Sequence, residues 1–482
     1  MSRNTAIDLA CEYFDGGAFR ADLVRRVAYR TESQDPRSGP VLRAYLVEEI
    51  IPQLQRLGFE ARVVSNPASE RHPFLLARRC EHPSLPTVLT YGHGDVQLAH
   101  ADQWRPGLDP WEVTVEGEHW YGRGTADNKG QHTVNLAALE QVLRVREGRL
   151  GYNVTVLLDM GEEAGSPGLS EVCAALREEL AADLLIASDG PRLSAEQPTV
   201  FLGSRGSINF TLRFAARNQS HHSGNWGGVL SNPAVVLANA LASMVDGRGK
   251  ILVEGLRPPR IPASVREALA NVAVDRSAAS PGWDDSWGEP GLTPSERLFG
   301  WNTLEILAMT SGDPDGPVNA IPSSARAHCQ LRFVVGTDWT NAERIMRDHL
   351  DRHGFSMVEV EVEHSTAATR LDPEDKWVGW ALESLQRTTG KTPALLPNLA
   401  GSLPNDAFAD VLGLPTIWIP HSYPGCAQHA PNEHLKAPLM REAMRIMAGI
   451  FWDLGSLGPD WLSVAGSSSH SSLATPEERL VP

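Results

Sequence analysis

Residues 87–97 read TVLTYGHGDVQ, a short apolar run followed by two polar side chains, His93 and Asp95. A short apolar run bounded by turn residues predicts a buried strand. In open α/β sheets, ligands bind in the crevice beyond the carboxyl ends of the strands. We therefore expect His93 and Asp95 to lie at the rim of a binding site, with both side chains on the same face of the chain.

The same pattern recurs twice further along the chain. Acidic side chains follow the apolar runs at 153–159 and 183–188, namely Glu162, Glu163 and Asp189. The loop at 120–130, WYGRGTADNKG, precedes a helical pattern and brings Asp127 to the same rim. Because the ends of neighbouring strands meet at one edge of a sheet, segments far apart in the sequence should converge on a single site.

The spacing of apolar residues predicts an α/β fold. Further buried strands are expected at 73–77 and 414–420, and amphipathic helices at 41–57 and 129–147. This alternation favours a central, mostly parallel sheet with helices on both faces. A chain of 482 residues exceeds what one core usually supports, so we expect two domains.

A middle segment has a different texture, because apolar and polar residues alternate in it as they do in half-exposed strands. We interpret 205–365 as an inserted α+β domain. It would contain helices starting at Asn232-Pro233 and near 341–353. The remaining parts, 1–204 and 366–482, would form one catalytic, metal-binding domain. The stretch 256–303 carries no clear pattern, and the tail from Ala465 is expected to be mobile.

Composition excludes several classes of protein. The formal net charge of −16 and the absence of a Lys/Arg cluster argue against nucleic acid as a partner. No apolar run approaches the ~20 residues that span a bilayer, and the first residues lack a signal-peptide pattern, so we expect a cytoplasmic protein without a membrane anchor. The five cysteines lie far apart without a C-x-x-C pair, which favours buried thiols over disulfides or a thiolate zinc site.

A cluster of one histidine and several carboxylates has two physical solutions, which are to bind cations or to neutralise itself through raised pKa values. Metal binding is favoured, because imidazole and carboxylate ligands suit Zn, Mn or Co, and a carboxylate such as Asp127 can bridge two ions. Asp95 could accept the second ring N–H of His93 and fix its tautomer. The adjacent Glu162 and Glu163 cannot point the same way, so one can bind metal while the other acts as a general base.

Six motifs in this order resemble those of the M20 metallopeptidases, especially the branch of carnosinase-like dipeptidases. They are Y-G-H-G-D-V, G-R-G-T-A-D-N-K-G, G-E-E-A-G-S-P-G, S-D-G, H-S-G-x-x-G-G and H-A-P-N-E-H, and they cover nearly the whole chain. The resemblance implies two divalent metal ions per chain, with zinc favoured and Mn or Co as alternatives. It assigns five metal ligands: His93, Asp127 as the bridge, Glu163, Asp189 and His429.

The resemblance also implies that 205–365 is a lid that serves dimerisation, and it assigns catalytic and substrate-binding roles. Glu162 would be the general base that takes a proton from a metal-bridged water. His222 on the lid, with His221 as an alternative, would reach the partner subunit's site and stabilise the oxyanion, so a homodimer is implied. Four residues would hold the substrate's carboxylate: Asn319, Arg332, Gly401 and Ser402.

The expected function is hydrolysis of an amide bond in dipeptides or similar small substrates with a free carboxylate. An alternative on the same scaffold is an N-acyl-amino-acid deacylase or carbamoylase. Leu399 slightly favours the alternative, because some relatives carry a glutamate near the substrate amine there; Asn128 and Ala400 also depart from the family pattern, which often has Asp and Gly. A non-catalytic binding protein on this fold is a third reading, and the intact ligand set argues against it.

Overall fold

The computed structural model describes residues 2–274 and 282–457. Its largest feature is an eight-stranded sheet, whose strand order is β1-β2-β6-β3-β7-β16-β8-β15. In chain order, the strands are β1 (Glu60–Val64), β2 (Phe74–Arg79), β3 (Thr87–His93), β6 (Asn153–Asp159), β7 (Leu184–Ala187), β8 (Thr199–Phe201), β15 (Ala394–Leu396) and β16 (Thr416–Trp418). The pairings β6–β3, β3–β7, β7–β16 and β8–β15 are parallel, whereas β1–β2, β2–β6 and β16–β8 are antiparallel. The α/β fold class is confirmed, with a mixed sheet.

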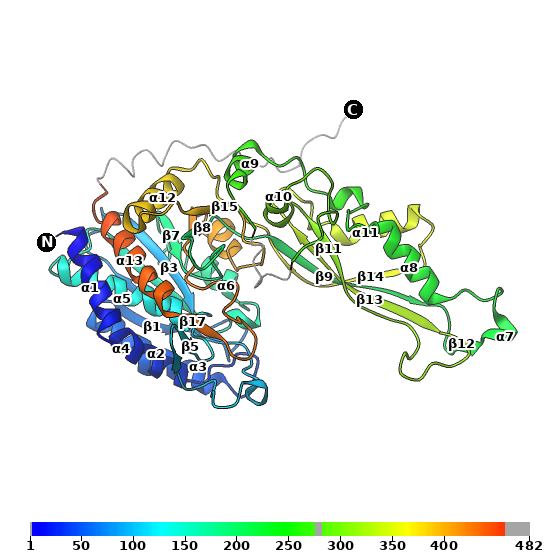
Figure 1. The fold of residues 1–482 in the computed structure, drawn as a ribbon, viewed down its shortest axis with the longest axis horizontal. Helices are drawn as coiled ribbons and strands as arrows, with labels where there is room; N and C mark the ends of the chain where they lie inside the picture. Colours follow the sequence, from blue (N-terminus) through cyan, green and yellow to red (C-terminus); the bar gives the residue numbers. More distant parts are fainter. Residues whose placement is uncertain (1, 275–281, 458–482) are drawn as a thin grey trace.

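Helices cover both faces of this sheet (Figure 1). Consecutive residues of β3 point to opposite sides, so that Val88 joins one apolar core and Leu89 the other. The helices over the Val88 side are α1 (Arg3–Asp15), α2 (Ala18–Ala28), α3 (Gly39–Ala44), η1 (Tyr45–Ile50), α4 (Ile51–Arg56), α5 (Lys129–Val145), α12 (Lys376–Thr389) and α13 (Ala437–Leu454). Those on the Leu89 side are α6 (Leu169–Ala175), α9 (Ala263–Ala270), α10 (Pro294–Phe299) and η5 (Ala407–Val411).

The predicted helices agree with these elements. The pattern at 41–57 corresponds to α3, η1 and α4, which follow one another without a break, and Gly58 ends the run with a positive φ of 81°. The pattern at 129–147 corresponds to α5, which is buried along almost its whole length. Because α5 starts directly after Asp127, its position fixes the loop that carries this residue.

A second sheet forms the lid. Its antiparallel strands have the order β11-β13-β9-β14 and comprise β9 (Gly206–Ala215), β11 (Thr303–Thr310), β13 (Ser324–Phe333) and β14 (Glu359–Thr366). The helices α8 (Pro233–Met244) and α11 (Ala342–Arg352) pack on one face of it. The predicted start of α8 is confirmed, since the Asn232 side chain accepts a hydrogen bond from the Ala234 N–H.

At the tip of the lid, β10 (His221–His222) pairs with β12 (Ala320–Ile321), and the short helix α7 (Ser223–Trp226) follows β10 (Figure 1). The lid sheet uses only residues between Gly206 and Thr366. The division into 1–204 with 366–482 and 205–365 stays a prediction.

The stretch 256–303 contributes α9 and α10 to the core beneath the eight-stranded sheet, not to the core of the lid. Helix α10 begins with a capping box, in which the Thr293 and Glu296 side chains each accept a hydrogen bond from the other residue's backbone N–H. The short helix η4 (Glu254–Leu256) precedes α9. The tail from Ala465, expected to be mobile, lies outside the described residues.

Two expectations from composition concern the helices and the cysteines. Among the described residues, no helix is both long and apolar enough to cross a membrane. All five cysteines are free thiols, and Cys173, Cys329 and Cys426 are buried. The expectation of burial is wrong for Cys80, which follows the end of β2 and is exposed, and only partly right for Cys11, which is half-buried on α1.

Candidate active site

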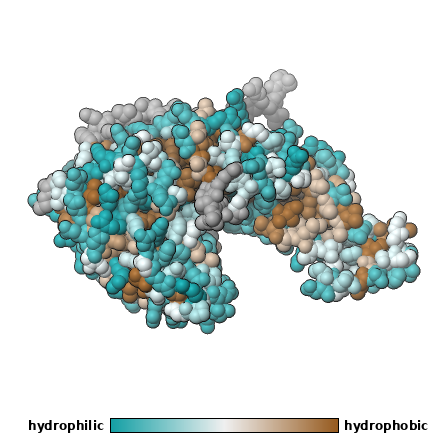
Figure 2. Space-filling view, viewed as in Figure 1, coloured by the Kyte–Doolittle hydropathy of each residue, from teal (hydrophilic) through white to brown (hydrophobic). Residues whose placement is uncertain are grey.

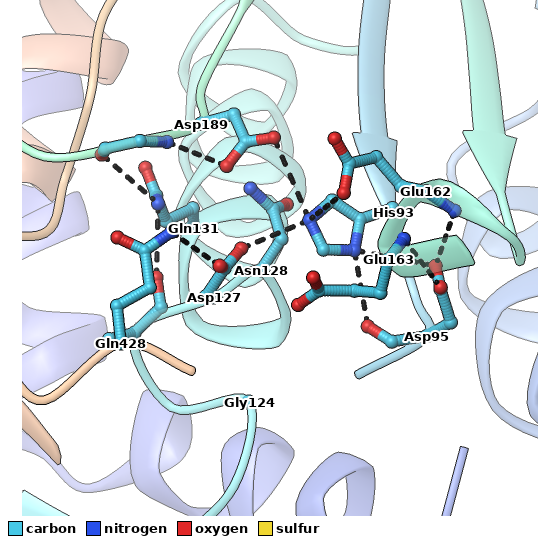
Figure 3. A network of polar contacts seen from close by, with 12 residues as sticks. His93, Asp95, Gly124, Asp127, Asn128, Gln131, Glu162, Glu163, Asp189 and Gln428 are labelled. Atoms are coloured by element: carbon cyan, nitrogen blue, oxygen red, sulfur yellow. Dashed lines mark hydrogen bonds and ion pairs between the residues drawn. The ribbon is translucent and has the colours of Figure 1, made fainter. Parts of the chain in front are cut away.

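The carboxyl ends of three parallel strands and one loop converge, as the sequence predicts (Figure 3). His93 is the last residue of β3, Asp189 follows β7, and Glu162 and Glu163 open the short helix η3 (Glu162–Ala164) after β6. Asp127 lies in the loop that leads into α5. The parallel pairing of β6, β3 and β7 brings these ends to one edge of the sheet.

Asp127 lies between two histidines. Its Oδ1 is 3.0 Å from Nε2 of His93, and its Oδ2 is 2.9 Å from Nε2 of His429. Asp189 Oδ2 lies 3.6 Å from Nε2 of His93, and Glu163 Oε2 lies 3.1 Å from Nε2 of His429. The five residues assigned as metal ligands therefore form two groups that share Asp127.

The adjacent Glu162 and Glu163 are in different surroundings. The Glu163 side chain is 2% exposed, faces His429 and accepts a hydrogen bond from Gln97 Nε2 at 2.9 Å. The Glu162 side chain is 18% exposed, and its Oε2 lies 4.0 Å from Nε2 of His93. Glu162 thus has access to the cavity beside the cluster, whereas Glu163 is held inside it.

Asp95 is fully buried and organises the cluster from behind. Its backbone carbonyl lies 3.1 Å from Nδ1 of His93, and its carboxylate Oδ1 lies 3.4 Å from the same atom. The carboxylate accepts hydrogen bonds from the backbone N–H groups of Glu162 at 3.2 Å and Glu163 at 3.0 Å. A proton on Nδ1 of His93 leaves Nε2 free to bind a metal.

Burial and mutual repulsion control the pKa values of the cluster. Desolvation, followed by the charge of Asp127, raises the pKa of Glu163 to about 7 and that of Asp189 to about 6. Burial alone would lower the pKa of His429, but hydrogen bonds to Asp127 and Glu163 outweigh it and raise the pKa to about 11. The negative charge of the carboxylates in the cluster therefore exceeds the positive charge that its histidines can supply.

The cluster fits divalent metal ions. One donor atom each from His93, Asp127 and Glu163 lies within 4.8 Å of the others, so residues of both groups lie close enough together to hold metal. Among the described residues, these carboxylates form ion pairs only with histidines, and no lysine or arginine neutralises them. Nitrogen and oxygen donors with surplus negative charge match zinc, manganese or cobalt.

Two residues near Asp127 were not expected. Gln428 donates a hydrogen bond from its side chain to Oδ2 of Asp127. The carboxylate of Glu433 accepts hydrogen bonds from the backbone N–H groups of Gly124 at 3.0 Å, Ala126 at 2.9 Å and Asp127 at 3.1 Å. It also pairs with Arg123 at 2.7 Å, and both side chains are 1% exposed. Glu433 stands in the motif H-A-P-N-E-H, in which only the first histidine received a role, and Gln428 directly precedes this motif.

Three of the four residues expected to bind the substrate carboxylate lie in the same cavity as the cluster. This cavity has a volume of about 1350 Å³, and its walls include Asp127, Glu162, Arg332, Gly401 and Ser402. Arg332 on β13 donates a hydrogen bond from Nη1 to Oγ of Ser402 at 2.8 Å, across from the lid to the loop after β15. Figure 2 shows the molecule hollowed between the larger part and the lid.

His222 and Asn319 do not join this cavity. Both lie at the tip of the lid, where His222 pairs with Ala320 in the β10–β12 ladder, and both are exposed (Figure 1). The His222 Nδ1 accepts a hydrogen bond only from the nearby Gly224 N–H among the contacts described. Within one chain, these two residues are therefore separated from the residues that they were expected to assist.

The cluster of histidines and carboxylates lies at the strand ends, beside a cavity that a separate lid sheet closes on one side. This combination defines a metal-dependent hydrolase. The model of peptidase family M20/M25/M40 matches residues 89–453, and the chain belongs to this family. It is an enzyme that hydrolyses amide bonds, and the resemblance seen in the sequence is confirmed.

Named relatives match most of the chain. A Beta-Ala-His dipeptidase from Mus musculus is 36% identical over 396 residues, which are 79% of this chain and 80% of the relative. A Cys-Gly metallodipeptidase from Candida albicans is 31% identical over 440 residues, covering 86% of this chain and 90% of the relative. Each match therefore covers about four fifths or more of both chains.

Solved structures share the fold. The dipeptidase Dug1p from Saccharomyces cerevisiae superposes with a TM-score of 0.76 at 21% identity, covering 95% of this chain and all of that one. Human carnosine dipeptidase 1 superposes with a TM-score of 0.73 at 24% identity, covering 94% of this chain and 99% of that one. The arrangement of a large sheet with a lid is therefore shared with both.

Proposed function

We propose that this protein is a dipeptidase that uses two divalent metal ions to cleave the amide bond of dipeptides or similar small substrates with a free carboxylate. The observation that carries the proposal is the position of Asp127, whose two carboxylate oxygens face two different histidines at 3.0 and 2.9 Å. Such a carboxylate is suited to bridge two ions. The matched relatives from mouse and Candida albicans, themselves a dipeptidase and a metallodipeptidase, support the choice of substrate.

The ligands would be His93, Asp127 and Asp189 for one ion, and Asp127, Glu163 and His429 for the other. Zinc is the metal that this donor set favours, with manganese or cobalt as alternatives. When bound, the ions polarise the scissile carbonyl and lower the pKa of the attacking water. The cytoplasmic location stays a prediction from the sequence.

Glu162 would be the general base. Its side chain reaches the cavity, whereas that of Glu163 is enclosed and paired with His429. The Glu162 carboxylate takes a proton from the attacking water, and the hydroxide adds to the carbonyl carbon. As the tetrahedral intermediate collapses, the C–N bond breaks, and Glu162 returns the proton to the leaving amine nitrogen.

The carboxylate of the substrate would bind Arg332, because a guanidinium group binds a carboxylate through two parallel hydrogen bonds. Gly401 and Ser402 lie beside it in the cavity wall. Leu399 also lines the cavity and packs against Gly190, next to Asp189. Because of this apolar contact, N-acyl amino acids are included among the substrates that test the function.

His222 and Asn319 would act on the site of a partner subunit, so the active form would be a homodimer. An exposed lid edge supports this arrangement. On the edge strand β11, Ile306, Leu307 and Met309 are 44%, 60% and 42% exposed. Apolar surface on the lid is visible in Figure 2. Exposed apolar edge strands are sites at which a second chain can pair.

The proposal is tested with metal-depleted protein reconstituted with Zn, Mn or Co. Each sample is incubated with a pool of dipeptides, their C-terminal amides and N-acyl amino acids, and losses are followed by mass spectrometry. We expect dipeptides with a free carboxylate to disappear, and a chelator to stop the loss. Loss of the N-acyl amino acids alone would identify a deacylase, and no loss with any metal would overturn the proposed activity.

A further inference from the structure

Arg205 lies where the chain passes from the eight-stranded sheet into the lid, one residue before β9. The residue is 6% exposed, and no carboxylate among the described residues lies within ion-pair distance of it, although Glu305 on β11 is near enough to raise its pKa. Its backbone N–H donates to the Leu399 carbonyl at 3.1 Å, and its Nε donates to the Ala400 carbonyl at 2.9 Å. Arg205 thus holds the start of the loop that contains Gly401 and Ser402.

A third contact connects Arg205 with Arg332. The hydroxyl of Ser402 donates its hydrogen to the Arg205 carbonyl at 2.8 Å. The Ser402 oxygen in turn accepts the hydrogen bond from Nη1 of Arg332 at 2.8 Å. Because its only hydrogen is directed to Arg205, Ser402 presents lone pairs to Arg332 and orients that guanidinium group. Ser402 therefore acts here as a support for Arg332.

The two guanidinium groups also lie close enough to repel each other. Burial, and then the charge of Arg332, lower the pKa of Arg205 to about 10, so Arg205 remains protonated at neutral pH. Arg332 donates only to neutral acceptors, Gln330 and Ser402, in the part of the chain that the structure describes. Nη1 of Arg205 is buried, with no hydrogen-bond partner among the same residues. A carboxylate bound to Arg332 would relieve this repulsion.

We propose that Arg205 is a positioning residue for recognition of the substrate carboxylate. It fixes the loop at 399–402, orients Arg332 through Ser402, and adds a second positive charge behind it. This inference rests on the proposed function, since it assumes a substrate with a free carboxylate at Arg332. It assigns Arg205 an effect on binding of the carboxylate and not on the chemical step.

The test compares Arg205→Met, which removes the charge and the Nε–H donor, with Arg205→Lys, which keeps the charge. Arg213→Met is the matched control, because Arg213 is exposed on the same strand, β9. Each variant is assayed with the dipeptide that the wild type hydrolyses fastest and with the C-terminal amide of that dipeptide. Thermal unfolding of each variant shows whether it folds as the wild type does.

We expect Arg205→Met to raise KM for the free dipeptide about tenfold or more while kcat changes less than about threefold. KM for the amide should stay unchanged, and Arg205→Lys should recover part of the loss. Equal changes in KM for the dipeptide and its amide, or no change for either, would overturn the inference. If Arg205→Met fails to fold, Arg205→Lys decides, because a KM equal to that of the wild type would exclude a role for the guanidinium.

Calorimetric binding of the pooled dipeptides, one at a time, and of their C-terminal amides to Glu162→Ala protein, with and without Arg205→Met, repeats the comparison without turnover. Weaker binding of the dipeptide alone would support the inference even if the wild type hydrolysed nothing. Binding unaffected by Arg205→Met would overturn it even if the wild type were a dipeptidase. The two proposals can therefore fail separately.

Discussion

The strand-end cluster and the tip of the lid carry residues that one reaction would use, but they are built in opposite ways. In the cluster, His93 and Asp127 are buried, and hydrogen bonds to backbone groups and to other side chains hold them in place. At the tip, the exposed His222 belongs to a two-residue ladder and the exposed Asn319 directly precedes it, with few contacts to fix them. Under the proposed function, one chain would therefore contain the complete metal-ligand set, whereas the groups at the tip would need a partner subunit.

This difference separates metal binding from oxyanion stabilisation, two properties that an activity assay alone would not distinguish. Metal binding should depend only on residues of one chain. Oxyanion stabilisation should depend on association of two chains, if His222 acts in the partner's site. Variants in the cluster and at the tip can therefore show whether the comparison holds.

The largest effect is expected from Glu162→Ala. Loss of the general base should lower kcat by about 10³- to 10⁴-fold, while metal content measured by mass spectrometry stays at the wild-type value. Glu171→Ala, which removes an exposed acidic residue on α6, serves as the control and should leave both properties unchanged. If Glu162→Ala retained wild-type rates, the assignment of the base would be wrong.

His222→Ala should have the next largest effect. Removing one group that stabilises an oxyanion lowers kcat by about 10²- to 10³-fold, and metal content should again stay unchanged. His221→Ala, beside it on β10, is the matched control and should retain most activity. The reverse result would transfer the role to His221.

Co-expression of the two inactive chains tests whether His222 acts across the subunit interface. In a mixed dimer of Glu162→Ala and His222→Ala chains, one of the two sites receives a working base and a working histidine. Random pairing should then restore about a quarter of the wild-type activity. Absence of any recovery in dimers shown to be mixed would place His222 outside the partner's site.

Local patterns in the sequence were sufficient to predict the cluster. His93, Glu162, Glu163 and Asp189 each follow an apolar run, and parallel pairing of strands dictates that such ends meet. His429 needed the family resemblance, because it lies on a loop after β16 where Ala427 and His429 both have positive φ values of 55° and 62°. No periodic pattern predicts the path of such a loop.

The remaining features depend on contacts between residues distant in sequence. Glu433 meets the loop at 124–127 because the strand that follows it, β17 (His434–Lys436), pairs with the strand that precedes the loop, β5 (His119–Tyr121). Arg205 was overlooked because an arginine in S-R-G has no local signature of burial. For α10, in contrast, the capping box at Thr293 and Glu296 is a local sequence signal that predicts the start of a helix. It lies within the stretch 256–303, which carries no clear periodic pattern.

Glu433→Gln should have a smaller effect than Glu162→Ala or His222→Ala, and it tests whether one chain holds the metal site by itself. The amide keeps the shape of the side chain but removes the charge that three backbone N–H groups and Arg123 surround. With the loop less firmly held, Asp127 should bind metal about 10- to 100-fold more weakly, as for other residues that orient ligands. Competition with a chelator of known affinity measures this change.

Glu196→Gln provides the control for Glu433→Gln, because Glu196 lines the same cavity but its side chain is 76% exposed. The weakening should be equal at low and high protein concentration, since the support comes from the same chain and not from a partner. A loss of metal affinity that appeared only on dilution would instead mean that dimerisation organises the cluster. In that case, the buried cluster would depend on the association of two chains, as the exposed tip is expected to do.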